Sequence, residues 1–312
     1  MNEFENKKIT LIGPGGVGGY IGTLLAKTFP HVTLVARGER GKSIRANGIT
    51  LTSDWSGNHT AYPEATVESA LELPPQDYIF ICVKQYSLES VCASLKNAVT
   101  RDTVIIPVMN GVDPGERTRR YLQDGTVIDS LIYIVAFANE DYSITQQGDG
   151  VRIYLGIENA SPQEWEKVES VCRMLSLAKI PCRAAKDIQA EIWKKYILNC
   201  AYNVETAYYN NTIGQLRDDP QKAAQYEALT NEAYQVAKKK NIQITEEEKE
   251  GMIERFYHQM AYDATSSLQR DILAQRPTEL ETFGGYLIKE AHRLGVPVPV
   301  SEMMYEGLKK MV

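Results

Sequence analysis

Three polar side chains spaced four residues apart, Lys195, Asn199 and Asn203, are the first candidates for chemistry in this 312-residue sequence. If their segment is helical, this spacing places all three on one face. The positions around them, such as Trp193 and Tyr196, are mostly apolar. A lysine and two amides on an apolar helix can form a hydrogen-bonding wall for a small polar ligand. They can equally form a solvated stripe or a polar seam against a neighbouring helix, and the stripe alone does not decide between these alternatives.

A glycine-rich loop near the start of the chain predicts a dinucleotide site. It satisfies G-x-G-x-x-G, follows a short apolar strand and opens a helical stretch. The first glycine permits a tight turn, the second lets a pyrophosphate approach the backbone, and the third allows close packing of helix on strand. The helix N-terminus then offers free N–H groups to phosphates. The alternative, an ordinary strand-to-helix turn, is less consistent with these flanks. The residues assigned to the loop are Gly13, Pro14, Gly15, Gly16, Val17 and Gly18.

The end of the second predicted strand indicates which dinucleotide is bound. NAD-binding proteins usually place an acidic residue there for the ribose 2′-hydroxyl. Here the position holds Arg37, with Arg40 and Lys42 close behind. A guanidinium suits a 2′-phosphate by charge and by its planar fork of donors, so the sequence predicts NADP(H). Glu39 is a caution, because its carboxylate can partly restore NAD binding.

Two further polar residues end predicted strands. Lys84 closes the third clear strand, and Asn110 closes the next. Ligands of open α/β sheets bind outside the carboxyl ends of the strands, so Lys84 is a candidate for cofactor phosphate and Asn110 for the nicotinamide side and the substrate. The alternatives are a surface lysine and a turn-forming Asn-Gly pair.

The order of segments predicts an α/β fold with two domains. Up to about residue 125, apolar strands alternate with helices, which indicates a Rossmann-type, doubly wound parallel sheet. The segment 29–60 contains one strand and is otherwise predicted to be irregular. The β-rich segments from residue 126 to 157 read as strands added to the edge of this sheet. Beyond Lys186 the pattern is helical throughout. We predict a nucleotide-binding domain at 1–182 and a helical catalytic domain at 183–312, with a cleft between them.

Composition argues for a soluble protein that binds small molecules. The net charge is −6 and lysines and arginines form no run, which argues against nucleic acid or an anionic membrane as the main partner. The start of the chain has no apolar signal segment, and no apolar run is long enough to span a bilayer. The five scattered cysteines and four scattered histidines predict a reducing, cytoplasmic setting and no metal site. Apolar faces on the late helices are compatible with a homodimer and equally with packing inside one chain.

The second half supplies the candidates for acid–base chemistry. Carbonyl reduction by a nicotinamide leaves a developing alkoxide that needs a proton donor. No histidine is well placed, so Lys195 is the natural candidate, with Glu279 as a carboxylate that places it. Ser267 is a candidate for binding a substrate carboxylate. Taken alone, Glu279 also fits as a helix N-terminal charge and Ser267 as an N-cap.

Together these motifs resemble the ketopantoate reductase family nearly end to end. The specific parts are W-K-K-x-x-x-N-C-x-x-N-x-x-T-A at 193–207 and S-x-x-x-D…R-x-T-E at 267–279. The resemblance implies a Rossmann-type domain and a helical domain like the C-terminal part of 6-phosphogluconate dehydrogenase. It also implies NADPH-dependent reduction of 2-dehydropantoate to (R)-pantoate in pantothenate biosynthesis. It makes Lys195 the proton donor and Glu279 a residue that fixes cofactor and lysine. The implied substrate residues are Asn110, Asn199, Asn203 and Ser267, and Ala136 is implied as a backbone contact to the cofactor.

The chain departs from the family pattern where substrate identity is at stake. Ile213-Gly214 and Gly284-Gly285 stand where many relatives have Asn-Gly, and FANEDYS replaces a turn rich in glycine and proline. Two alternatives therefore stay open: reduction of another branched 2-oxo acid, and a non-catalytic NADP-binding sensor. The presence of both Lys195 and Glu279 argues against the sensor, which needs no proton donor.

Overall fold

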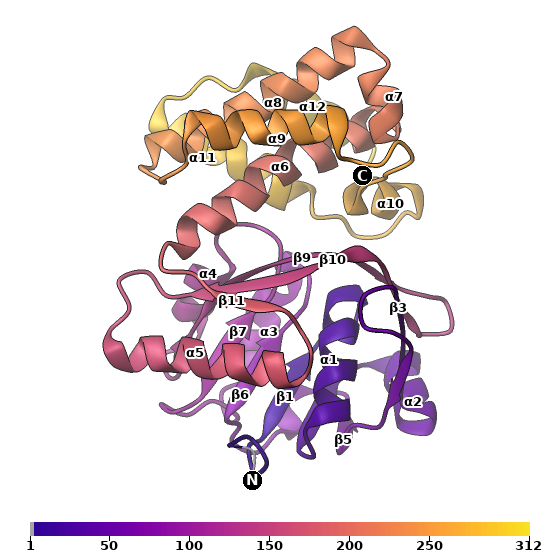
Figure 1. Ribbon diagram of the computed structural model, residues 1–312, viewed down its shortest axis with the longest axis vertical. Coiled ribbons are helices and arrows are strands. Elements are labelled where there is room, and N and C mark those ends of the chain that lie inside the picture. Colours follow the sequence, from indigo (N-terminus) through magenta and orange to yellow (C-terminus); the bar gives the residue numbers. More distant parts are fainter. Residues whose placement is uncertain (1–2) are drawn as a thin grey trace. The chain divides into compact units, whose positions relative to one another are not determined.

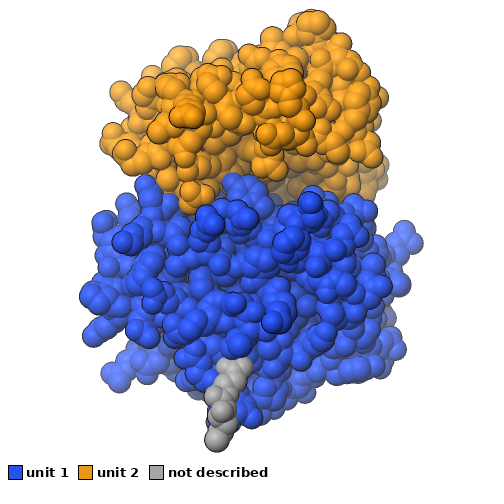
Figure 2. Space-filling view, viewed as in Figure 1, with its two compact units in different colours: residues 1–188 blue, residues 189–312 orange. Residues whose placement is uncertain are grey.

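The computed structural model describes residues 3–312, which divide into two compact units (Figure 2). The first unit ends at Ile188 and the second begins at Gln189. Every strand of the described residues lies in the first unit, and the second is built from helices (Figure 1). The predicted fold class, a Rossmann-type α/β part followed by a helical part, is confirmed.

A six-stranded parallel sheet forms the centre of the first unit. Its order is β5-β2-β1-β6-β7-β8, so the chain starts in the middle and winds outward in both directions. β1 (Ile9–Ile12) and β6 (Tyr78–Ile81) are buried at every position, as strands covered on both faces must be. The carboxyl ends of all six strands meet at one edge, where such sheets bind ligands. The other strands are β2 (Val32–Val35), β5 (Ala65–Val67), β7 (Val104–Pro107) and β8 (Thr126–Val127).

Two apolar clusters cover the two faces of this sheet. α1 (Gly16–Thr28) and α5 (Pro162–Leu177) contribute to one cluster. α3 (Leu88–Ser94) and the end of α4 (Pro114–Tyr121) contribute to the other. The sheet is therefore doubly wound. Two short 3₁₀ turns, η1 (Ala70–Glu72) and η2 (Gln85–Ser87), complete this part.

The prediction that the β-rich segments extend the edge of the first sheet is wrong, except for β8. They form a second sheet, in which β9 and β10 pair as an antiparallel hairpin and β10 also runs parallel to β3 and β11. The reason is a long-range pairing: Ile144 of β10 lies opposite Leu51 of β3. No local pattern reports such a partner. The strands are β3 (Ile49–Ser53), β4 (His59–Ala61), β9 (Asp129–Ala138), β10 (Ile144–Gly156) and β11 (Cys182–Ala184).

The prediction of an irregular segment after β2 is also wrong, because that segment holds α2 (Gly38–Asn47), β3 and β4. α2 buries only Gly41 and Ile44. Its sequence therefore lacks the apolar periodicity that marks most helices.

The glycines of α1 allow it to pack closely on both sheets. A Cβ on Gly18 would lie 2.3 Å from the Gly13 carbonyl oxygen of the first sheet's loop. On the other side, a Cβ on Gly16 would lie 2.3 Å from the Ala136 oxygen of β9, and one on Gly19 would lie 2.4 Å from Ile144 of β10. The glycine-rich sequence is thus a packing requirement as well as a ligand motif.

The second unit is organised around α6 (Ile188–Tyr209), whose Trp193 and Tyr196 are almost fully buried. Thr245 forms a capping box with Glu248 at the start of α9. None of the helices within residues 3–312 is both long and apolar enough to cross a membrane. The other helices are α7 (Ile213–Arg217), α8 (Pro220–Lys239), α9 (Glu246–His258), α10 (Ser267–Leu273), α11 (Tyr286–Leu294) and α12 (Pro299–Leu308), with a π-helical turn at Glu281–Gly285.

Candidate functional site

The glycine loop has the geometry of a phosphate cradle. Gly13 has a φ of +83°, and a Cβ there would lie 2.8 Å from the Cys82 carbonyl oxygen. Gly15 is the N-cap of α1, and a Cβ on it would have only the Arg40 guanidinium within 4 Å, at 3.8 Å. The loop is therefore tightly packed around Gly13 and Gly18 and open at Gly15. The open side leaves space for a ligand to approach the backbone at Gly15. This arrangement fits a pyrophosphate at the start of α1.

Ala136 lies against this loop, because β9 brings its carbonyl oxygen to Gly16. The residue is half-buried and faces the first turn of α1. The second sheet thus contributes to the surroundings of the loop.

Two arginines follow β2. Arg37 is exposed and is the N-cap of α2. Arg40 is half-buried and donates from Nη1 to the Pro14 carbonyl oxygen at 2.9 Å. Glu39, the acidic residue that raised doubt about the cofactor, forms an exposed ion pair with Lys42 at 2.7 Å. Positive charge therefore predominates next to the glycine loop.

Lys84 and Asn110 follow β6 and β7 at the carboxyl edge of the sheet, and both are half-buried. Gln85, which the sequence interpretation did not single out, connects their loops. Its Nε2 donates to the Asn110 carbonyl oxygen at 2.7 Å, and its Oε1 accepts from Arg117 at 2.5 Å. Asp113 accepts a further bond from Gln85 at 3.3 Å. A buried glutamine after a strand has no distinctive sequence signal.

In the second unit, Lys195 has the electrostatic properties expected of a proton donor. Burial lowers the pKa of its ammonium group to about 8, although the nearby Glu279 carboxylate acts in the opposite direction. A pKa near the working pH lets a group both hold and release a proton. The neighbouring Lys194 has another role, because it forms ion pairs with Glu191 at 3.1 Å and Glu248 at 2.5 Å.

Glu279 lies immediately before the helical segment that begins at Leu280, and only 3% of it is exposed. Its carbonyl oxygen accepts from the Thr282 and Phe283 amides. The Tyr196 hydroxyl donates to the Thr282 carbonyl oxygen at 2.8 Å. This buried bond anchors the segment after Glu279 to α6 at the residue that follows Lys195.

The stripe on α6 changes character along its length. Asn199 is half-buried, and its side chain has no hydrogen-bond partner in the described part of the chain. Asn203 is buried, and its Oδ1 accepts from Ser267 Oγ at 3.1 Å and from the Leu268 amide at 3.3 Å. Its Nδ2 donates to the Asn199 carbonyl oxygen at 3.2 Å. Asn203 therefore binds the N-terminus of α10, whereas the Asn199 amide takes no part in this contact.

Residues to which no role was assigned from the sequence continue this contact toward the end of α6; one of them, Thr206, belongs to the motif at 193–207. The Thr206 hydroxyl donates to Ser266 Oγ at 2.7 Å, and both residues are fully buried. Tyr202 donates to the Thr265 carbonyl oxygen at 2.7 Å. The N-cap of α10 is Ser266, which accepts from the Gln269 amide, so Ser267 is not the cap. Since two serines follow each other at 266–267, the sequence does not indicate which of them caps the helix.

The positions that depart from the family pattern are tightly packed. Ile213 is fully buried after the N-cap Thr212. A Cβ on Gly214 would lie 2.2 Å from the Tyr262 ring, and one on Gly284 would lie 2.7 Å from the Tyr305 ring. Both glycines therefore lie in close contact with an aromatic ring, and of the two only Gly284 differs from the family pattern.

The predicted site residues form two groups, one in each unit. The glycine loop, Ala136 and the residues after β2, β6 and β7 belong to the first, and the α6 stripe with Glu279 and Ser267 belongs to the second. Within residues 3–312, no three histidine, cysteine or acidic side chains gather as metal ligands would.

Comparisons with known proteins agree with this division. The family model "Ketopantoate reductase PanE/ApbA" matches residues 9–159, and its C-terminal counterpart matches residues 187–312. An uncharacterized oxidoreductase of Bacillus subtilis, YkpB, is 28% identical over 97% of this chain and 98% of its own length. A 2-dehydropantoate 2-reductase of Mesorhizobium japonicum is 27% identical over 68% of this chain and 70% of its own.

A solved structure adds to the similarity in sequence. The 2-dehydropantoate 2-reductase of Methylococcus capsulatus superposes with a TM-score of 0.85 at 26% identity, covering 97% of this chain and 96% of that one. Since the two family models together match most of the sequence, this chain belongs to the ketopantoate reductase family of oxidoreductases.

Proposed function

We propose that this protein is an NADPH-dependent 2-dehydropantoate 2-reductase, which forms (R)-pantoate for pantothenate biosynthesis. The observation that carries the proposal is Lys195, a lysine whose pKa is lowered to about 8 and which is accompanied by the buried Glu279 carboxylate. The names of relatives in the family support the substrate.

The first unit holds the cofactor in this proposal. Gly13, Gly15 and Gly18 shape the loop for the pyrophosphate, and Arg37 lies where a 2′-phosphate is recognised. Lys84 and Asn110 follow strands at the carboxyl edge of the sheet; we assign Lys84 to a cofactor phosphate and Asn110 to the nicotinamide side and the substrate. When bound, NADPH supplies the hydride that reduces the ketone carbon of the substrate.

The second unit supplies the proton and orients the substrate. Lys195 donates a proton to the ketone oxygen as negative charge develops there, and is neutral afterwards. Glu279 stabilises the ammonium form and so keeps the lysine protonated at neutral pH. The Asn199 amide is available to donate to the substrate. Ser267 is the residue that we assign to the substrate carboxylate; in the structure its hydroxyl donates to Asn203, so binding the carboxylate would exchange that bond.

The test is a steady-state assay of NADPH consumption with 2-dehydropantoate, with the alcohol product analysed by chiral chromatography. We expect turnover with NADPH, weaker turnover with NADH, and the (R) product. Cofactor binding without turnover on any 2-oxo acid would instead favour a sensor.

A second candidate is the reduction of another branched 2-oxo acid. It is favoured by the buried Ile213, which replaces an amide side chain, and by Gly284. An apolar side chain cannot bond a substrate hydroxyl, whereas a matching amide discriminates strongly for it. Comparing kcat/KM for 2-dehydropantoate with that for its analogue without the hydroxyl decides between the candidates. Equal values, or a preference for the analogue, would favour the second.

A further inference from the structure

Arg40 is a half-buried cation that lies beside the glycine loop and has no anionic partner among the described residues. Among residues 3–312, neither Arg37 nor Arg40 has a carboxylate partner, whereas Arg45 on the same helix binds Glu68 at 3.3 Å. Arg37 is exposed, so water screens its charge. Arg40 is half-buried, and burial lowers the pKa of its guanidinium. A desolvated charge without an anion is unfavourable, which suggests that a ligand provides one.

Two contacts hold Arg40 against the loop. Its Nη1 donates to the Pro14 carbonyl oxygen at 2.9 Å, and the guanidinium carbon lies 5.8 Å from the centre of the Tyr142 ring, within the range of a cation–π contact. The same Nη1 is the atom nearest to the open side of Gly15. A guanidinium has five N–H donors, and the other donors of Arg40 have no protein acceptor in the described residues.

Tyr142 is held in place by a well-bonded turn between β9 and β10. Its amide donates to the Asn139 carbonyl oxygen at 3.0 Å, and its φ is +69°. The Asn139 side chain donates to Ser143 and Thr145, both at 2.9 Å. The FANEDYS sequence, which departs from the family pattern, therefore forms a rigid turn that presents an aromatic ring to Arg40.

We propose that Arg40 is a second specificity-determining residue, which binds the 2′-phosphate of the adenosine ribose of NADPH, and that Tyr142 positions it. The end of β2 is the ribose side of a dinucleotide site, and a phosphomonoester offers the acceptor oxygens and negative charge that Arg40 lacks. The inference rests on the proposed function only in that the first unit binds NADPH, and it is independent of the substrate.

The test measures binding to the protein without turnover, by calorimetric titration with four ligands: NADPH, NADH, adenosine 2′,5′-bisphosphate and 5′-AMP. We expect Arg40→Gln to weaken the two 2′-phosphorylated ligands about tenfold or more, since it removes a charged hydrogen-bond partner, and to leave the other two unchanged. Arg45→Gln is the matched control and should change none of them.

The role of Tyr142 is tested by two variants. Tyr142→Leu removes the ring and should weaken the 2′-phosphorylated ligands about threefold, the size expected for one cation–π contact. Tyr142→Phe keeps the ring and should bind all four ligands as the unaltered protein does. If Arg40→Gln is not stable enough for titration, Arg40→Lys can replace it. That variant keeps the positive charge without the planar guanidinium, and it should show a smaller loss of affinity, restricted to the two 2′-phosphorylated ligands.

Three results would overturn the inference. One is an equal loss for all four ligands in Arg40→Gln, which would make Arg40 a support of the loop only. Another is no loss at all. The third is an unaltered protein that prefers NADH or binds neither dinucleotide. By contrast, tight NADPH binding with the expected Arg40 effect but no reduction of 2-dehydropantoate would refute the proposed function and leave this inference standing.

Discussion

Asn203 accepts a hydrogen bond from Ser267 Oγ at 3.1 Å, which joins the middle of α6 to the first residue of α10. The polar stripe of α6 therefore serves two purposes. Its first half holds Lys195 and Asn199, the residues that we assign to the substrate, and from Asn203 onward it is a seam against α10 and the loop before it. The hydrogen bonds of Asn203 confirm the seam for that half of the helix, and the ligand wall stays a prediction for the other half.

The link between Asn203 and Ser267 predicts coupled effects of mutation. Ser267→Ala removes one donor, and Asn203→Ala also deprives the Leu268 amide of its acceptor. We expect Asn203→Ala to cost about 1–3 kcal/mol of unfolding free energy, and the double-mutant cycle to show about 1 kcal/mol of coupling. Urea denaturation measures both. Strictly additive effects would mean that the bond does not form in solution.

Lys195→Met should abolish the proton donor while keeping the fold. We expect kcat to fall by a factor of about 10² to 10⁴, the usual contribution of a positioned acid, with NADPH affinity retained. Lys194→Met is the control, because that lysine is held in ion pairs with Glu191 and Glu248 and should keep most activity. Equal losses in the two variants would argue against the assignment of Lys195.

The pH profile of reduction should report the pair of Lys195 and Glu279. With a pKa of about 8, Lys195 is protonated below that pH and loses its proton above it, so kcat should decline on the alkaline side. Glu279 raises the pKa of the lysine. Glu279→Gln removes this influence and should move the alkaline limb toward lower pH. A limb that stays in place would show that Glu279 acts only through structure.

The sequence predicts those features that depend on local patterns. The apolar runs of β1, β6 and β7 and the glycine loop identify the first sheet, and the helical periodicity after residue 186 identifies the second unit. Features that depend on partners distant in the chain cannot be predicted from such patterns. The second sheet needs β3 to meet β10, and the role of Asn203 depends on which face α10 presents to it.

Arg37 should determine the choice of cofactor together with its neighbours. Arg37→Gln is expected to lower kcat/KM for NADPH about tenfold or more, through loss of a charged hydrogen bond, with little change for NADH. Glu39→Gln is an informative companion, because Lys42 already engages this carboxylate at 2.7 Å. It should leave use of NADH unchanged. A fall in NADH use would mean that Glu39 binds the ribose.

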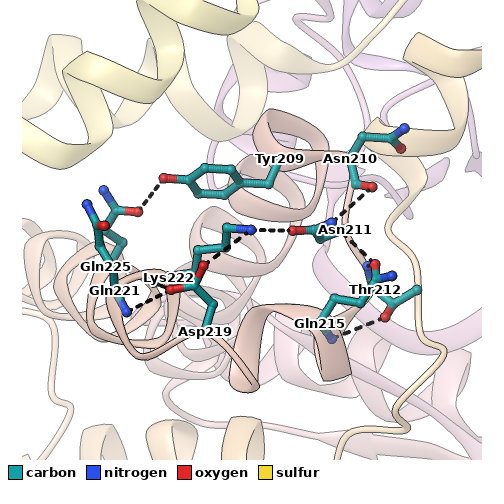
Figure 3. A network of polar contacts seen from close by, with 9 residues as sticks. All are labelled: Tyr209, Asn210, Asn211, Thr212, Gln215, Asp219, Gln221, Lys222 and Gln225. Carbon is teal, nitrogen blue, oxygen red and sulfur yellow. Dashed lines mark hydrogen bonds and ion pairs between the residues drawn. The ribbon is translucent and has the colours of Figure 1, made fainter.

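Glu205, on the part of α6 after the stripe, is fully buried, and neither carboxylate oxygen has a hydrogen-bond partner within residues 3–312. Lys222, the cation that influences this carboxylate, makes its close contacts with other residues (Figure 3). It donates to Asn211 Oδ1 at 2.9 Å, lies 3.5 Å from Asp219 Oδ2 and stacks over the Tyr209 ring at 4.8 Å. Burial raises the pKa of Glu205 to about 9; Lys222 opposes this weakly, and the Asp219 carboxylate adds to it. The Glu205 carboxylate in turn contributes to raising the pKa of the Tyr209 and Tyr226 hydroxyls.

The folded protein should consequently become less stable as pH rises, and Glu205→Gln should remove that dependence. Below about pH 4 the carboxyl is protonated in both states. Between there and about pH 9 the unfolded chain releases the proton while the folded chain keeps it, so unfolding becomes easier. We expect the variant to gain about 4 kcal/mol relative to the unaltered protein between about pH 5 and pH 8, because one proton costs about 1.4 kcal/mol per pH unit; urea denaturation at each pH measures this gain. The exposed Glu247→Gln should gain nothing, and parallel curves for Glu205→Gln and the unaltered protein would show that Glu205 is ionised in the fold.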